Sequence, residues 1–236
     1  MSLVRNNALR LALAAILASA ATAASANVLV VRSAGPSAAT YPPGRSLPDN
    51  SRVTLRANDV LVVLDGRGTR TYRGAGAVNL SQAQAGTRTV VAANGQRARV
   101  GAVRSAAIFP SNPSTSIWQI DASQGGTVCL PSASEATLWR PDATRSGSLT
   151  IGGPSGASQQ VNWPAGQATL AWPAAMPIAD GAEYSLSQPG VAVPTQVRVK
   201  LIGPIPGDLP GVAATLIRNE CREQLDLLVA AAPIDQ

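Results

Sequence analysis

Short apolar runs of strand length, separated by turn residues, recur along most of the chain and limit what it can fold into. The 236 residues include 21 glycines and 18 prolines, while 45% of the residues are hydrophobic. High apolar content argues that these breaks are turns rather than disorder. The sequence therefore predicts a mainly β protein built from two antiparallel β modules and one C-terminal α-helix.

The first module is expected over residues 27–105, with about six strands. Its Asn94-Gly95 pair, within the stretch TRTVVAANGQRARVGAV, predicts a tight hairpin because both residues tolerate positive φ. The other expected strands are NVLVVR (27–32), RVTLR (52–56), VLVVLD (60–65) and residues 69–73.

Residues 106–116 have the composition of a linker, and eight candidate strands follow within the second module, residues 117–236. Their short, regular spacing predicts a sandwich of immunoglobulin-like type. The module is expected to end in a helix over about residues 209–230, with Asp208 as its N-cap and Pro233 beyond its end. We expect this helix to cover an edge or face of the second module.

Cys129 and Cys221 are the chain's two cysteines, and they predict one disulfide. Cys221 lies on the apolar face of the expected helix, and Cys129 lies in the strand-like run GTVCL. The bond would therefore join the C-terminal helix to the second module. A reactive thiol is the alternative.

Residues 1–26 have the features of a cleaved signal peptide. Arg5 and Arg10 precede a short apolar core, and Ala24-Ser25-Ala26 fits the small-x-small cleavage pattern, so the mature chain would begin at Asn27. Retention of this segment as an anchor is the alternative. We expect a periplasmic or secreted bacterial protein, with no transmembrane segment after cleavage.

Charge is distributed unevenly between the two modules. Residues 27–105 contain eleven arginines and three aspartates, whereas residues 106–236 contain six basic and ten acidic residues. The basic part could bind an anionic polymer, its arginines could protect strand edges, or the two parts could attract each other. Nucleic acid is disfavoured, because the chain is expected to be exported and this part has only two aromatic residues.

The stretch VLVVLDGRGTRTYRGAG, Val60 to Gly76, carries arginines at every third position after its glycines. A phosphate-binding loop would need a helix to follow, whereas Thr-Arg-Thr-Tyr-Arg favours a strand. We therefore interpret residues 65–68 as a hairpin turn, which places two of the arginines on opposite strand faces. The candidate binding residues here are Arg67, Arg70, Tyr72 and Arg73.

The segment over residues 41–76 resembles the periplasmic β module of FecR-like proteins. The resemblance rests on Gly44, Leu47, Val53, Leu55, Asp59, Leu61, Val63 and Gly66. It implies an envelope protein that senses or relays signals by protein contact. Signalling members of that family carry a membrane helix and a cytoplasmic tail, and this sequence shows neither.

Trp-Pro-Ala occurs twice, beginning at Trp163 and at Trp172. The two indoles could stack on a carbohydrate, or they could pack at the corners of the sandwich.

Histidine is absent, so a Ser-His-Asp or Cys-His catalytic set cannot form within the chain, and no cofactor or metal is expected. The carboxylate pairs considered for catalysis are Asp180 with Glu183 and Asp121 with Glu135. The sequence thus favours a non-enzymatic exported envelope protein that binds another envelope protein or an anionic polymer, in a sensing or scaffolding role. A carboxylate-based glycan hydrolase and a carbohydrate-binding module are the alternatives.

Overall fold

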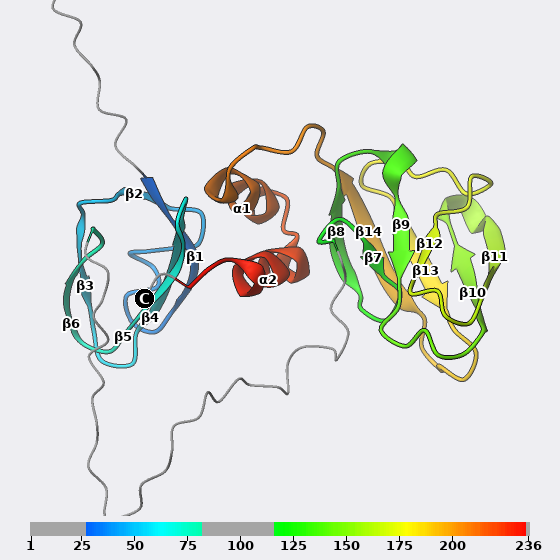
Figure 1. Cartoon of the computed structure of the whole chain (residues 1–236), viewed down its shortest axis with the longest axis horizontal. Coiled ribbons are helices and arrows are strands. Elements are labelled where there is room, and N and C mark those ends of the chain that lie inside the picture. Colours follow the sequence, from blue (N-terminus) through cyan, green and yellow to red (C-terminus); the bar gives the residue numbers. More distant parts are fainter. Residues whose placement is uncertain (1–26, 82–115, 235–236) are drawn as a thin grey trace, which may run out of the picture.

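The computed structural model describes residues 27–81 and 116–234 of the chain. These residues form a mainly β protein with several sheets and two C-terminal helices (Figure 1). The expected signal peptide, the Asn94-Gly95 hairpin and nearly all of the linker lie outside the described residues. Within the described residues, no helix is both long enough and apolar enough to cross a membrane.

The first module, residues 27–81, consists of a four-stranded sheet and a two-stranded ribbon. The sheet has the order β2-β1-β4-β5, and the ribbon pairs β3 with β6; all of these pairs are antiparallel. Apolar side chains from the sheet and the ribbon meet in one core around the buried Tyr72. The strands are β1 (Asn27–Ala34), β2 (Ser46–Pro48), β3 (Arg52–Leu55), β4 (Val60–Asp65), β5 (Gly68–Arg73) and β6 (Gly76–Asn79).

Strands β1 and β4 are buried on both faces, which explains why their sequences are continuously apolar rather than alternating. Val28 and Val30 of β1 face the ribbon, together with alternate residues of β4. Leu29 and Val31 face the opposite side, where the C-terminal helices cover them. The central strands of this sheet therefore depend on a segment from the other end of the chain.

The second module, residues 120–201, packs a five-stranded sheet and a three-stranded sheet around a common core. The orders are β11-β10-β13-β14-β8 and β12-β9-β7. The β14–β8 and β7–β9 pairs are parallel, so the expectation of purely antiparallel modules was wrong here. The strands are β7 (Ile120–Asp121), β8 (Gly126–Leu130), β9 (Thr137–Trp139), β10 (Gly147–Gly152), β11 (Ser158–Trp163), β12 (Thr169–Ala171), β13 (Glu183–Ser187) and β14 (Thr195–Leu201).

The C-terminal segment forms two helices where the sequence predicted one over residues 209–230. Helix α1 (Leu209–Arg218) begins at the predicted cap, where the Asp208 side chain accepts a hydrogen bond from Gly211 N. Helix α2 (Arg222–Ala231) follows a break at which Glu220 adopts a φ of 60°. A left-handed residue cannot continue a right-handed helix, so the axis changes direction there.

The helical pair lies between the two modules (Figure 1). Val212, Ala213 and Leu216 of α1 and Leu228 of α2 share a core with the helix-facing side of β1 and β4. The expectation that the helix covers the second module was therefore incomplete, because its apolar face mainly covers the first. Charge adds to this contact, since Arg32 of β1 forms an ion pair with Asp226 of α2.

The predicted disulfide is confirmed: Cys129 of β8 and Cys221, at the start of α2, are bonded, with their Cα atoms 5.9 Å apart. Both cysteines are fully buried in the core that the helices share with the first module. The disulfide thus fixes the helical pair to the second module while the helices pack on the first.

Gln224 of α2 reinforces this attachment by occupying the free edge of β8. Its Oε1 accepts from Cys129 N at 2.6 Å, and its Nε2 donates to Cys129 O at 2.8 Å. Nε2 also donates to Ile117 O at 2.6 Å. The side-chain amide therefore makes the two bonds that a neighbouring strand would make, and it leaves these buried backbone groups of β8 satisfied.

We expect Gln224→Leu to lower the free energy of unfolding by about 2–4 kcal/mol. Leucine has a similar shape but no amide, so it leaves buried backbone donors and acceptors without hydrogen bonds. Urea denaturation under non-reducing conditions measures this. The neighbouring exposed change Glu223→Gln is the control and should cost less than about 1 kcal/mol. Equal stability of the two variants would contradict the bridging role of Gln224.

Candidate functional site

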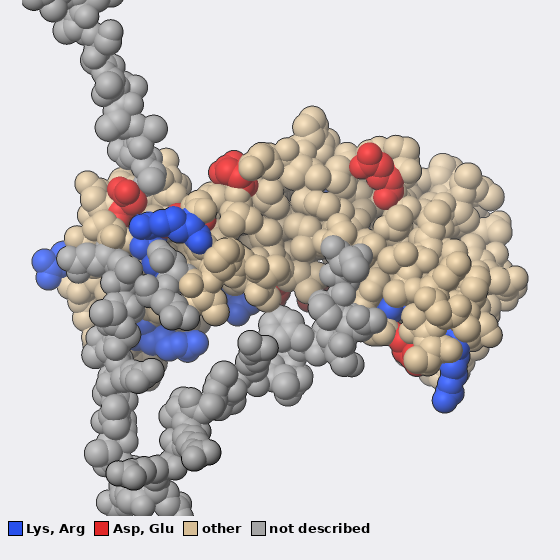
Figure 2. All heavy atoms as spheres, viewed as in Figure 1, with Lys and Arg blue, Asp and Glu red and all other residues tan. Residues whose placement is uncertain are grey.

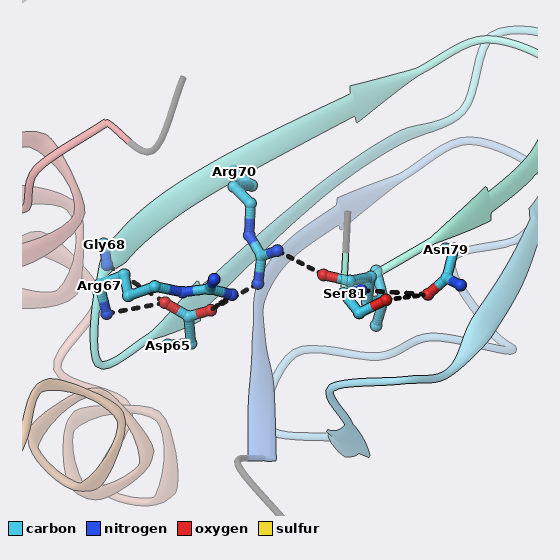
Figure 3. A network of polar contacts seen from close by, with 7 residues as sticks. Asp65, Arg67, Gly68, Arg70, Asn79 and Ser81 are labelled. Atoms are coloured by element: carbon cyan, nitrogen blue, oxygen red, sulfur yellow. Dashed lines mark hydrogen bonds and ion pairs between the residues drawn. The ribbon is translucent and has the colours of Figure 1, made fainter. Parts of the chain in front are cut away.

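The Asp65–Gly68 turn is the hairpin that the sequence predicted. Asp65 pairs with Gly68 across β4 and β5, so Gly66 and Arg67 form a two-residue turn. Four hydrogen-bond donors of this turn and the following strand converge on the Asp65 carboxylate: Arg67 N and Nη2, Gly68 N and Arg70 Nη2 (Figure 3). The turn is therefore organised around an internal anion rather than around a bound phosphate.

Asp65 is 4% exposed, and its charge is neutralised inside the module. Arg67 N and Gly68 N donate to Oδ1 at 2.8 and 3.2 Å, and the Arg70 guanidinium reaches Oδ2 at 2.5 Å. Burial raises the pKa of this carboxyl, but the hydrogen bonds from Arg67 and the charges of Arg70 and Arg67 outweigh burial and hold the pKa below its usual value.

Arg70 and Tyr72 lie on the inner face of β5 and are 4% and 1% exposed. Arg70 also donates to the carbonyl of Leu80, just beyond β6, and so links the sheet to the ribbon (Figure 3). Arg73 is exposed, on the opposite face from Arg70, as the spacing predicted. Burial leaves Arg70 and Tyr72 no surface to offer a partner, so we do not include them in a binding face.

Pro233 and Ile234, which follow α2, dock beside this hairpin. Thr69 N donates to Pro233 O at 2.8 Å, and Thr69 pairs with Ile234 in a parallel bridge. Gly68 has a φ of +143°, and a Cβ at this position would lie 2.1 Å from Pro233 O. Glycine at position 68 is thus required both by the backbone conformation and by the close approach of residue 233.

The two tryptophans lie within the second module and do not form a stacking platform. Trp163 is 3% exposed, and the Arg140 guanidinium lies over its ring at 5.0 Å. Trp172 is half-buried; its Nε1 donates to Met176 O, and its ring meets Tyr184 edge-on at 5.2 Å. Both positions fit the corner-packing interpretation of the Trp-Pro motifs.

The carboxylates considered for catalysis face different structural partners. Asp180 accepts a hydrogen bond from Leu201 N, whereas Glu183 forms an ion pair with Arg198. Asp121 accepts from Ser123 N and Oγ, at the end of β7. Among the described residues, no group of three or more acids, cysteines or histidines could hold a metal ion.

A different set of exposed basic residues lies near Tyr41 and the strand that its hydroxyl contacts. The Arg45 guanidinium lies 5.8 Å from the centroid of the Tyr41 ring, and the Tyr41 hydroxyl accepts a hydrogen bond from Thr54 N at 3.1 Å. Thr54 lies between Arg52 and Arg56, and all three arginines are exposed. We call Arg45, Arg52 and Arg56 the arginine face.

The acids nearest the arginine face point inward or are partly covered. Asp59 is 2% exposed and accepts hydrogen bonds from Ser37 N and Arg56 N. Burial raises the pKa of Asp59, but the hydrogen bonds from Ser37 and Arg56 outweigh it, so the pKa lies below its usual value and the group stays ionised. Asp49 is half-buried.

On the side of the molecule drawn in Figure 2, most of the blue Lys and Arg atoms lie over the first module. The described residues 27–81 include seven arginines and three aspartates, of which one arginine and two aspartates are buried. The charge bias seen in the sequence is therefore stronger at the surface of this module than in its composition.

Sequence reasoning missed Arg45 and Tyr41 as parts of a surface, although a signal was present. Val53 and Leu55 alternate with Arg52, Thr54 and Arg56, so the period of two already placed the arginines on one outward face. The position of Tyr41 depends on a loop fold that no local pattern indicates.

We expect Asp65→Asn to lower the free energy of unfolding by about 3–5 kcal/mol at pH 7, because the change leaves the buried Arg70 charge uncompensated. The folded-state pKa of Asp65 is lowered, so its ionised form stabilises the fold above about pH 3.9, and this contribution is lost as the pH falls toward the folded-state pKa. The difference between wild type and variant should therefore shrink below about pH 4. Denaturant titrations at several pH values measure it.

Asp49→Asn provides the matched control for this experiment, because it makes the same change at a half-buried site of the same module. Its effect should stay below about 1 kcal/mol. A pH-independent cost for Asp65→Asn would contradict the stabilising role of the ionised carboxylate.

Comparisons of the chain with protein-family models, with curated proteins and with solved structures found no match. The resemblance to FecR-like modules stays an expectation.

Proposed function

We propose that this protein is a non-catalytic binding protein of the bacterial envelope that holds an anionic polymer on its arginine face. The observation that carries the proposal is the separation of charge within the first module. Its two strongly hydrogen-bonded aspartates are buried, while Arg45, Arg52 and Arg56 remain exposed.

The shape of this region suits an extended ligand. Arg52 and Arg56 are four residues apart in an extended segment, which corresponds to about 13 Å at the usual rise of a strand. Across the ribbon, Arg52 pairs with Asn79 and Thr54 with Ala77, so the partner strand places no charged residue opposite them. A polymer with repeated charges could contact several guanidinium groups without entering a cavity.

Tyr41 contributes by protecting the edge of β3. Its hydroxyl accepts from Thr54 N, a backbone donor that the ribbon leaves free. With that donor occupied, side chains rather than main-chain pairing would determine what binds at this edge. This favours recognition of charge over the addition of a partner strand.

The disulfide between Cys129 and Cys221 is compatible with the periplasmic or secreted location expected from residues 1–26. Anionic polymers are frequent in such compartments, and a rigid scaffold of two modules would present the arginine face to them. A scaffolding role fits this arrangement better than turnover.

We expect a fluorescently labelled alginate oligosaccharide to bind the wild-type protein, with log Kd depending steeply on log salt because bound counterions are released. The double variant Arg52→Gln/Arg56→Gln should weaken binding at least 10-fold and reduce the salt slope by about 1–2. Fluorescence anisotropy at several NaCl concentrations measures both quantities.

The control variant Arg198→Gln/Arg222→Gln removes the same charge from exposed positions outside the first module, and it should bind nearly as wild type. Neutral dextran should not bind. Equal weakening by both double variants would show a net-charge effect and refute a specific arginine face.

A further inference from the structure

A groove at one end of the second module is separate from the arginine face. It has a volume of about 400 Å³, within the range of small-molecule sites. The loop between β9 and β10 forms one wall, and the ends of β11 and β13 form the other. The residues used below are Arg140, Asp142, Arg145, Gly147, Ser148 and Trp163.

Arg140 is fixed in place beside this groove. Its Nε donates to Gln167 O at 3.1 Å, its Nη2 donates to Pro164 O at 2.8 Å, and its guanidinium covers the Trp163 ring. An ideal Cβ on Gly147 would lie 3.5 Å from Arg140 Nη1, so the glycine leaves space next to that nitrogen. A preorganised guanidinium with space beside one nitrogen is a ready donor for an anion.

The groove has a positive balance of charge. Arg140 and Arg145 face one acid, Asp142. Hydrogen bonds from Thr144 to Asp142, together with the charges of Arg145 and Arg140, keep the pKa of Asp142 below its usual value. That carboxylate is thus already engaged by Thr144, while the exposed Arg145 remains available to a ligand.

The same geometry argues against a neutral sugar. The Trp163 ring is 3% exposed and lies under Arg140, so no aromatic face is available for stacking. Hydroxyl groups are nonetheless at hand, from Ser148 and other serines of the wall. Charge-assisted bonds to a carboxylate, supplemented by hydroxyl contacts, are what this groove can supply.

We propose that this groove binds a small carboxylate-bearing sugar, with the carboxylate at Arg140 and Arg145. The inference does not depend on polymer binding by the first module. Trp163 lines the groove and its Nε1 has no hydrogen-bond partner among the described residues, so the indole N–H signal reports on occupancy of the groove.

Titration of the full protein with glucuronate tests the proposal, followed by the Trp163 indole N–H signal in ¹H–¹⁵N spectra, assigned with Trp163→Phe. We expect a saturable shift with a Kd in the millimolar range or tighter. Arg145→Gln should raise the Kd about 10-fold, which corresponds to about 1.4 kcal/mol. Gly147→Val, which fills the space beside Arg140, should abolish the shift.

Arg198→Gln is the matched control, because it removes one exposed arginine of the same module outside the groove, and it should leave the Kd unchanged. Glucose should produce no saturable shift, and inorganic phosphate should bind more weakly than glucuronate. Absence of saturation by glucuronate at about 20 mM, equal binding of glucose, tighter binding of phosphate, or unchanged affinity in both groove variants would each overturn the proposal.

Discussion

The attachment of α2 to the edge of β8 is the contact on which the rest of the structure depends. The disulfide fixes the start of the helix, and Gln224 makes paired hydrogen bonds to the backbone of Cys129. The same helical pair covers the helix-facing side of β1 and β4. Without this attachment, the first module would have an open hydrophobic face and the second would have an open strand edge. One short segment therefore completes both β modules.

Electrostatics in the first module follow from where its acids can be stabilised. Asp59 and Asp65 are held in the interior by backbone donors, and Asp65 also by Arg70. A buried carboxylate is costly unless its charge is compensated, so these sites require dense hydrogen bonding. Because the aspartates satisfy internal donors, they do not neutralise the arginines outside. The positive surface charge of the first module is thus a consequence of how the hairpin and the loop before β4 are stabilised by buried aspartates.

Local chemistry made several features predictable from the sequence. The strands β1, β3 and β4, the Asp65 hairpin, the Asp208 cap and the disulfide all follow from residue type and spacing. The break at Glu220 could not be predicted in this way. The apolar periodicity of the helical segment continues through the turn, and the left-handed residue is not a glycine. Two parallel strand pairs were also missed, since pairing between distant strands leaves no local pattern.

The candidate sites were less predictable than the fold, for a related reason. Arg70 was a candidate binding residue, yet tertiary packing buries it, and Trp163 is buried as the corner-packing interpretation expected. Conversely, the apolar runs in β1 and β4 were a signal that both faces of that sheet needed cover. The sequence did not say what would cover them, because the covering helices are separated from β1 by most of the chain.

This long-range contact between the helices and the first module affects the order in which parts of the protein can fold. Arg32 and Asp226, which bond across the interface between β1 and α2, are 194 residues apart in sequence. Contacts of such separation form late, since a long loop has to close before they stabilise anything. The helix-facing side of β1 and β4 therefore stays uncovered until residues 209–231 have been synthesised. During that interval, a chaperone bound to this apolar face would prevent the nascent polypeptide from aggregating.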